Sequence, residues 1–220
     1  MPRAALFDLD RTLLDCNSGR LWMQHELRAG NIRLRDAVWA SWWLARYSFG
    51  LESGLEDVFA AAVQGLKGQA EGELDLRTRD WFASQVRHRL RPGGAARLEA
   101  HRATGDVLVL ATSSSAYAAA AASEAFGLDD RISTLFEVVD GRFTGAISSL
   151  ALGHHKATRV REWAAARSID LSEAVFYTDS ITDLALLDAV GQPVAVNPDR
   201  ALRREARRRG WTVEDWGSSR

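Results

Sequence analysis

The sequence predicts an α/β protein with a Rossmann-like three-layer core around a parallel sheet and an inserted α-helical cap. Short apolar runs bounded by turn residues alternate with longer segments of helical periodicity, which is the pattern of a parallel α/β sheet. One long stretch interrupts this alternation with helical segments and no convincing strand. The 220 residues suffice for a core domain that carries a smaller insertion.

The core elements follow one another along the chain. Strands are predicted over residues 4–9, 107–111, 174–177 and 193–196, and helices over residues 117–126, 156–167 and 181–189. Residues 136–147 hold Asp140-Gly141 between two β-prone runs and predict a hairpin.

The cap is predicted over residues 16–91, and residues 1–15 and 92–220 form the catalytic core. Both boundaries have turn-forming composition, at 16–19 and at 91–94. The most apolar window, 37–51, is shorter than a membrane span and is interpreted as a helix. Its aromatic residues Trp39, Trp42, Trp43 and Tyr47 share one face. We interpret that face as cap core, with a substrate-facing or lipid-facing surface as the alternative.

Composition and charge exclude several classes of protein. With 46% apolar and 26% charged residues, the chain is neither largely disordered nor membrane-embedded. A net charge of -1 gives no reason to expect a nucleic-acid partner, so the arginine-rich segment 200–209 is interpreted as a solvated helix face. No signal-peptide region follows the first residues, and Cys16 has no cysteine to pair with. We therefore expect a cytoplasmic protein without a transmembrane segment.

Polar residues follow the predicted strands at the places where parallel α/β sheets bind ligands. Asp8 and Asp10 close the first strand two residues apart, so their side chains point the same way in an extended backbone. Ligands gather at the carboxyl ends of such strands. The other polar side chains expected at this edge are those of Thr112, Ser113, Lys156, Asp179 and Asp183.

This set of side chains suits a divalent cation and a phosphoryl group. Oxygen-only ligands favour Mg²⁺, and Lys156 would offset the negative charge that otherwise repels a phosphate ester. Thr112 is favoured as the phosphate-binding hydroxyl because it directly ends an apolar run, with Ser113 as its rival. His154 and His155 lack a nearby third metal ligand and receive no role.

In this order the motifs resemble those of the haloacid dehalogenase superfamily: Asp8-Leu9-Asp10-Arg11-Thr12, Thr112, Lys156 and Asp179-Ser180-Ile181-Thr182-Asp183. The continuation at 194–199, with Gly210-Trp211, resembles the phosphoserine-phosphatase-like branch. The resemblance implies that Asp8 forms an aspartyl-phosphate and that Asp10 is the general acid and base. It also implies Mg²⁺ bound by Asp8, the backbone carbonyl of Asp10 and Asp179, with Asp183 orienting these ligands or binding through water.

Two positions depart from the family pattern. Arg11 stands where glycine is common, and Asn17 stands where phosphoserine phosphatases have a glutamate for the substrate ammonium. A neutral amide cannot supply that charge pairing, so a substrate without an ammonium group is expected. The predicted function is magnesium-dependent hydrolysis of a small phosphomonoester. The alternatives are a phosphotransferase or mutase on the same core, a lipid-phosphate phosphatase in peripheral contact with a membrane, and a non-catalytic binding module.

Overall fold

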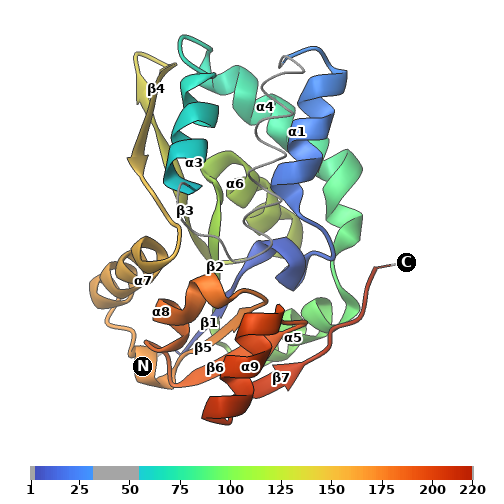
Figure 1. The fold of residues 1–220 in the computed structure, drawn as a ribbon, viewed down its shortest axis with the longest axis vertical. Coiled ribbons are helices and arrows are strands. Elements are labelled where there is room, and N and C mark those ends of the chain that lie inside the picture. Colours follow the sequence, from blue (N-terminus) through green and yellow to red (C-terminus); the bar gives the residue numbers. More distant parts are fainter. Residues whose placement is uncertain (1–2, 32–54, 220) are drawn as a thin grey trace.

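The computed structural model describes residues 3–31 and 55–219 (Figure 1). The aromatic face at Trp39, Trp42, Trp43 and Tyr47, and the apolar window 37–51, lie outside the described residues. Within them, seven strands form one sheet in the order β4-β3-β2-β1-β5-β6-β7, and every neighbouring pair is parallel except the antiparallel pair β3-β4. The predicted α/β class with a parallel sheet is confirmed.

The strands are β1 Ala4–Phe7, β2 Val107–Ser115, β3 Asp130–Val139, β4 Arg142–Ser149, β5 Val175–Thr178, β6 Gln192–Val196 and β7 Thr212–Glu214. The helices are α1 Ser18–Arg28, α3 Leu55–Gln64, α4 Glu71–Trp81, α5 Pro92–Ala103, α6 Ala116–Phe126, α7 His154–Ala166, α8 Leu184–Leu187 and α9 Arg200–Arg209.

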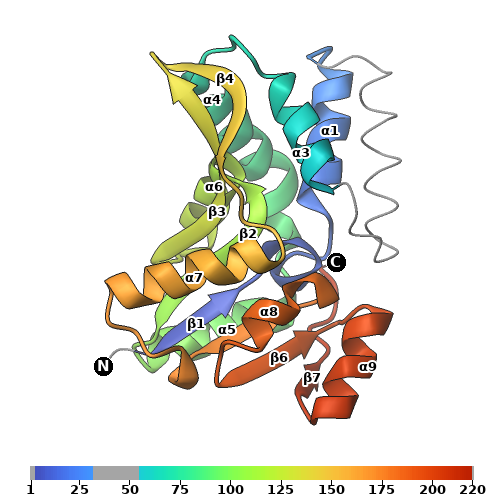
Figure 2. The same ribbon diagram turned by 60° about the vertical axis from the view of Figure 1, so that its left-hand side comes forward.

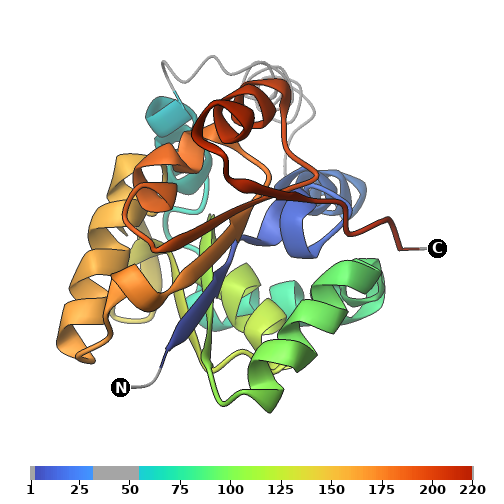
Figure 3. The same ribbon diagram turned by 90° about the horizontal axis from the view of Figure 1, so that it is seen from below.

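Strand β1 lies at the centre of the three layers. Ala5 and Phe7 point to the face that α5 and α6 cover, and Ala4 and Leu6 point to the face that α7, α8 and α9 cover (Figure 3). All four residues are fully buried, because both faces of a parallel sheet are covered by helices. A continuous apolar run, not an alternating one, is therefore what this position requires.

Local signals set the ends of the helices that flank the site. Ser115 caps α6 by accepting a hydrogen bond from the N–H of Ala118, and Gly127 ends that helix with φ 65°. Asp199 caps α9 in the same way, and Gly210 ends it with φ 69°. Short polar residues at the start and a left-handed glycine at the end are the usual boundaries of a helix.

Several parts of the core differ in extent from the sequence prediction, and strand β2 for example continues from the predicted end at residue 111 to Ser115. The hairpin is longer, because β3 and β4 run well beyond 136–147, and it turns at Asp140 and Gly141, which both have positive φ. The predicted helix 181–189 is divided into a 3₁₀ turn, Ile181–Asp183, and the short α8. Strand β7 was not predicted.

Helices α1, α3 and α4 stand together beyond the carboxyl ends of the core strands, and the β3–β4 hairpin runs up beside α3 (Figures 1 and 2). The chain leaves and re-enters the core side by side, where Leu14 pairs with Leu90. No helix among the described residues is both long and apolar enough to cross a membrane.

Candidate active site

The candidate site begins where β1 ends. Asp8 continues the strand pairing, since its N–H donates to a β5 carbonyl at 2.9 Å. The chain then makes one tight turn, Leu9–Leu13, in which Asp10 and Arg11 leave helical φ/ψ. Buried leucines at both ends of the turn anchor it on the core. The two acids are thereby held at the carboxyl edge of the sheet, as predicted from the sequence.

Lys156 is the cation on the floor of the site. Its ammonium lies 3.1 Å from Oδ1 of Asp8 and 2.7 Å from Oδ1 of Asp183. The other oxygen of Asp183 accepts a hydrogen bond from the Thr178 hydroxyl at 2.7 Å. A cation in the first turn of a helix opposes the helix dipole, so the carboxylates and not α7 account for this position. Three of the predicted residues therefore meet, and all three are buried.

Thr12 links two of the predicted acids, although sequence reasoning assigned it no role. Its Oγ1 lies 3.4 Å from Oδ2 of Asp8 and 3.4 Å from Oδ1 of Asp179, and it accepts a hydrogen bond from the N–H of Asp179 at 3.0 Å. One hydroxyl proton can serve only one carboxylate at a time. Thr12 is fully buried, so it fixes the spacing of the two acids. Its place four residues after Asp8 was the only available signal.

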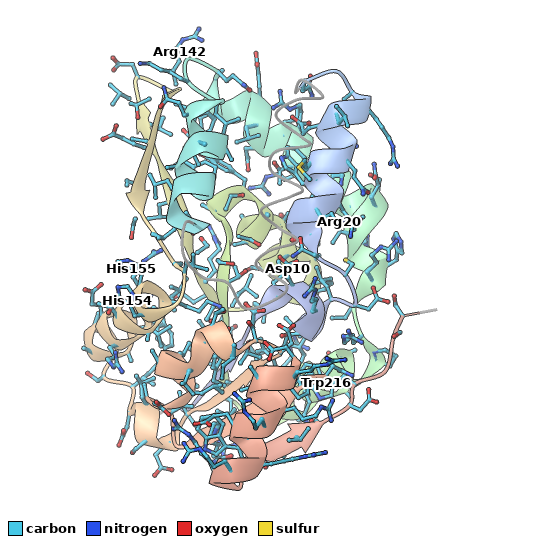
Figure 4. All side chains as sticks on the ribbon, viewed as in Figure 1. Asp10, Arg20, Arg142, His154, His155 and Trp216 are labelled. Carbon is cyan, nitrogen blue, oxygen red and sulfur yellow. The ribbon has the colours of Figure 1, made fainter. Side chains whose placement is uncertain are left out.

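The side chain of Asp10 faces the start of the inserted segment (Figure 4). Its Oδ1 accepts a hydrogen bond from the N–H of Ser18, the first residue of α1, at 2.6 Å. The hydroxyl of Ser114, which the sequence did not single out, donates to Oδ2 at 3.4 Å. Both Asp8 and Asp10 line the same cavity, and the chain turns directly after Asp10, where Arg11 has φ 60°.

The two rival hydroxyls after β2 occupy different places. Thr112 is only 1% exposed, and its oxygen accepts a hydrogen bond from the N–H of Ser114 at 3.2 Å. Ser113 borders the cavity of the site. Strand β2 continues to Ser115, so both hydroxyls belong to the strand and helix α6 begins only after it.

Burial dominates the electrostatics of the acids. It raises the pKa of Asp8 to about 7, although Lys156 pulls that pKa down. Burial also raises the pKa of Asp10, against the hydrogen bonds from Ser18, and raises the pKa of Asp179 well above its ordinary value, with Asp8 adding to the rise. The cluster therefore favours more positive charge than Lys156 supplies.

The donors at this edge fit a magnesium ion. Asp8 and Asp179 lie on either side of one threonine hydroxyl and both have raised pKa values, which a divalent cation would reverse. The described residues contain no group of three or more His, Cys, Asp or Glu side chains arranged as a metal site. The resemblance to the family implies the backbone carbonyl of Asp10 as a third protein ligand beside Asp8 and Asp179.

A cavity of about 530 Å³ opens over these groups. That volume lies within the range of small-molecule sites. Its lining comprises Asp8, Asp10, Arg11, Asn17, Ser113, Leu152, Lys156, Asp179, Ser180, Ile181, Thr182, Asp183, Asp199, Arg200 and Ala201. The loop at Asp199 is tied to the site, because its N–H donates to the carbonyl of Asp179 at 2.8 Å.

The remaining reactive side chains do not compete for the chemistry. Burial raises the pKa of the Cys16 thiol to about 12, with the charge of Asp10 adding to the rise, so this thiol is protonated near neutral pH. The rings of His154 and His155 lie 3.9 Å apart at the start of α7 (Figure 4). Neither His154 nor His155 lines the cavity.

Comparison with known proteins identifies the class. The family model described as haloacid dehalogenase-like hydrolase matches residues 5–188. The chain therefore belongs to the haloacid dehalogenase-like hydrolases, which confirms the resemblance inferred from the motifs.

Individual relatives match almost the whole chain. It is 31% identical to a histidinol-phosphatase of Neisseria meningitidis, over 97% of this chain and 98% of that protein. It is 33% identical to an inhibition of morphological differentiation protein of Streptomyces azureus, over 98% of this chain and 79% of that protein. The phosphoserine phosphatase SerB1 of Mycobacterium tuberculosis is 28% identical, over 100% of this chain and 73% of that protein.

Solved structures show the same fold. A protein of unknown function from Bordetella pertussis Tohama I superimposes with a TM-score of 0.88 at 31% identity, over 99% of this chain and 100% of that one. A phosphoserine phosphatase with an analogue of its phospho-aspartyl intermediate gives a TM-score of 0.70 at 16% identity, over 99% of this chain and 95% of that one.

Proposed function

We propose that this protein is a magnesium-dependent phosphatase that hydrolyses a small phosphomonoester through an aspartyl-phosphate on Asp8. The observation that supports this most directly is the position of Asp8. Its carboxylate is held between the Lys156 ammonium and the Thr12 hydroxyl on the floor of the cavity, with Asp179 across the same hydroxyl. A carboxylate fixed in this way can attack a phosphoryl group that lies above it.

In the first half-reaction, an oxygen of Asp8 bonds to phosphorus and the bond from phosphorus to the ester oxygen breaks. Asp10 gives its proton to that departing oxygen, and its raised pKa suits it to hold the proton beforehand. In the second half-reaction, Asp10 accepts a proton from water as the water oxygen attacks phosphorus. The bond between phosphorus and Asp8 then breaks and releases inorganic phosphate.

The other residues of the site hold Asp8 in position and neutralise charge around it. Lys156 lowers the pKa of Asp8 against the effect of burial, and Asp183 holds the Lys156 ammonium in place. Bound at Asp8, the Asp10 carbonyl and Asp179, Mg²⁺ would neutralise the carboxylates and polarise the phosphoryl oxygens. Ser113 borders the cavity and Thr112 stabilises the loop beside it, so both remain candidates for contacts to the phosphoryl group.

Asp8→Asn tests this proposal. The amide keeps the shape of the carboxylate but cannot attack phosphorus, so phosphate release from p-nitrophenyl phosphate in Mg²⁺ is expected to fall by about a thousandfold or more. Phosphate release is measured with and without EDTA. The matched control is Asp140→Asn, the same substitution at an exposed hairpin turn.

Full activity in Asp8→Asn, or activity that EDTA leaves unchanged, would overturn the mechanism. Product analysis distinguishes hydrolysis from phosphoryl transfer, because a transferase given a second alcohol leaves little free phosphate.

A further inference from the structure

The rim of the cavity carries positive charge that the proposed reaction does not use. The phosphoryl chemistry accounts for the acids and for Lys156 on the floor. Two arginines, Arg11 and Arg200, also line the cavity, and both side chains are exposed. A cavity of about 530 Å³ leaves room for a leaving group of several atoms beside the phosphoryl group.

Arg200 stands where the backbone gives no reason for a cation. It is the first residue of α9, and positive charge at a helix N-terminus opposes the dipole. Arg208 and Arg209 at the other end of α9 both pair with Glu205. Arg200 has no ion pair or hydrogen bond with any residue that the structure describes. Its charge is therefore available to a ligand in the cavity.

The acid nearest in sequence, Asp199, directs both of its carboxylate oxygens at backbone N–H groups and makes no ion pair with Arg200. Asp199 uses Oδ1 to accept a hydrogen bond from the N–H of Leu202 at 2.7 Å and Oδ2 to accept one from the N–H of Ile181 at 3.0 Å. Its own N–H donates to the carbonyl of Asp179. These bonds fix the start of α9 against the floor of the site, so Arg200 projects from a rigid base.

Arg11 adds to the positive charge of the rim but is already partly engaged. It has φ 60°, a left-handed conformation that non-glycine residues seldom adopt. Its charge works against the rise in the pKa of Asp10 and of Asp179. Asn17 is partly engaged as well, because its side-chain oxygen accepts a hydrogen bond from the N–H of Arg20 at 2.8 Å. Of these three rim residues, Arg200 has the greatest capacity for a new partner.

We propose that Arg200 is a specificity residue that binds a second anionic group, a carboxylate or a phosphate, on the leaving-group side of the substrate. This inference rests on the proposed phosphatase function and names the substrate class for the same site. A guanidinium binds both kinds of oxyanion through two parallel hydrogen bonds. A leaving group with an ammonium would instead lie beside a cation of the same sign.

The test compares the protein with Arg200→Ala, Arg200→Lys and the matched control Arg204→Ala, an exposed arginine of the same helix that does not line the cavity. The substrates are 3-phosphoglycerate for the carboxylate, propane-1,3-diyl bisphosphate for the second phosphate, glycerol 3-phosphate as the neutral counterpart and phosphoethanolamine as the cationic one. The quantity measured is the ratio of kcat/KM for each charged substrate to that for glycerol 3-phosphate.

The unmodified protein is expected to favour 3-phosphoglycerate or propane-1,3-diyl bisphosphate, the substrates with a second anionic group, over glycerol 3-phosphate. Arg200→Ala should lower that ratio by about 10- to 100-fold, mainly through KM, with Arg200→Lys in between and Arg204→Ala unchanged. A fall in the ratio for 3-phosphoglycerate shows that Arg200 binds a carboxylate, and a fall for the bisphosphate shows that it binds a phosphate. No preference for an added anion, or an equal loss in Arg204→Ala, overturns the role of Arg200 while the phosphatase stands. Failure of every substrate, p-nitrophenyl phosphate included, overturns the phosphatase itself.

Discussion

At the scale of single residues, the stability of the site depends on the balance between buried carboxylates and one buried ammonium. Asp8, Asp179 and Asp183 are all less than a tenth exposed, and Lys156 reaches two of them. Breaking a buried pair leaves one charge unpaired, which costs far more than the pair contributes when it is intact. Each member of the cluster therefore depends on the others.

Asp183→Asn tests this dependence. The substitution removes the charge that holds Lys156 at 2.7 Å while keeping a partner for the Thr178 hydroxyl. The Mg²⁺ concentration for half-maximal activity is expected to rise about 10- to 100-fold, as for other residues that orient metal ligands. Activity is titrated against Mg²⁺, with Asp188→Asn on the outside of α8 as the control. Unchanged titration curves for both variants would show that Asp183 has no part in metal binding.

Sequence reasoning reached the charged members of this cluster because each follows a strand or opens a helix. It missed Thr12 and Ser114, whose importance depends on what lies opposite them. The oxygen of Thr12 meets Asp179, 167 residues further along the chain. No local pattern records such a meeting, so the type of chemistry was predictable while the linking hydroxyls were not.

At the scale of elements, the β3–β4 hairpin is joined to the inserted segment by a row of backbone hydrogen bonds. Gly68 N–H donates to the carbonyl of Phe143 at 2.8 Å, Phe143 N–H donates to that of Gln69 at 3.1 Å, and Glu71 N–H donates to that of Gly141 at 2.9 Å. Phe143 is only 2% exposed and packs with Leu74 and Tyr117. We call this row of bonds the seam.

The seam bears on how the predicted cap would move over the site. An insertion attached to the core only where it leaves and returns could swing as a unit. Here the loop between α3 and α4, together with the first residue of α4, is also hydrogen-bonded to the hairpin, which runs up beside both helices (Figure 2). Closure would therefore carry the hairpin along or bend its strands, and the bulges in the β3–β4 pairing around Phe136 are places where bending costs least.

Phe143→Ala is expected to open the seam. Truncation of a buried phenylalanine costs about 3–5 kcal/mol, and the lost contacts lie between hairpin and insertion. Hydrogen exchange should show the amides of Gly68 and Glu71 opening before global unfolding. Phe126→Ala, in the main core, is the control and should lower global stability while these amides still exchange only through global unfolding. Identical exchange patterns in the two variants would mean that the seam is not a separate unit.

The sequence predicted these elements unevenly. The central strands of the core were recognisable because they are short, continuously apolar runs that alternate along the chain with segments of helical periodicity. The hairpin was recognised only near its turn, since the outer parts of β3 and β4 carry polar residues such as Asp130, Arg131 and Ser148. Strand β7 is three residues long, with two exposed, so it has almost no apolar signal.

At the scale of the whole molecule, a second polar network supports the core below the amino ends of β1 and β2. Asp106 accepts hydrogen bonds from Arg3 at 3.0 Å and from Thr104 at 3.0 Å, and lies 2.6 Å from Nδ1 of His101. The other ring nitrogen of His101 lies 2.8 Å from the hydroxyl of Tyr177 in β5. The network therefore joins segments at β1, α5, β2 and β5 that lie far apart in the sequence.

Acid should weaken this network. Burial acts to raise the pKa of Asp106, but the hydrogen bonds from Arg3, His101 and Thr104 outweigh it and hold the pKa below the ordinary value of 3.8. A carboxyl whose pKa is lowered by folding contributes stability above that ordinary value, and this contribution disappears as pH falls through the folded value.

Urea unfolding of the protein and of Asp106→Asn across pH 7 to pH 2.5 measures the contribution. At neutral pH the variant is expected to be less stable by about 1–3 kcal/mol, because charged hydrogen bonds are lost. The difference in free energy of unfolding between the protein and Asp106→Asn should decrease below pH 4. Asp140→Asn, at an exposed turn, should show no such convergence. A gap that stays constant with pH would contradict the assignment.

The central position of β1 in the sheet affects how the protein folds during its synthesis. Ala5 pairs with Leu108 on one side and with Val175 on the other. A ribosome adds about 5–20 residues per second, so this apolar strand waits roughly ten to thirty seconds for its second partner. Only then can the N–H of Asp8 donate its hydrogen bond to the carbonyl of Tyr177 in β5. A nascent chain halted before β5 would expose the unpaired apolar edge of β1. Exposed edges of this kind favour aggregation and the binding of chaperones.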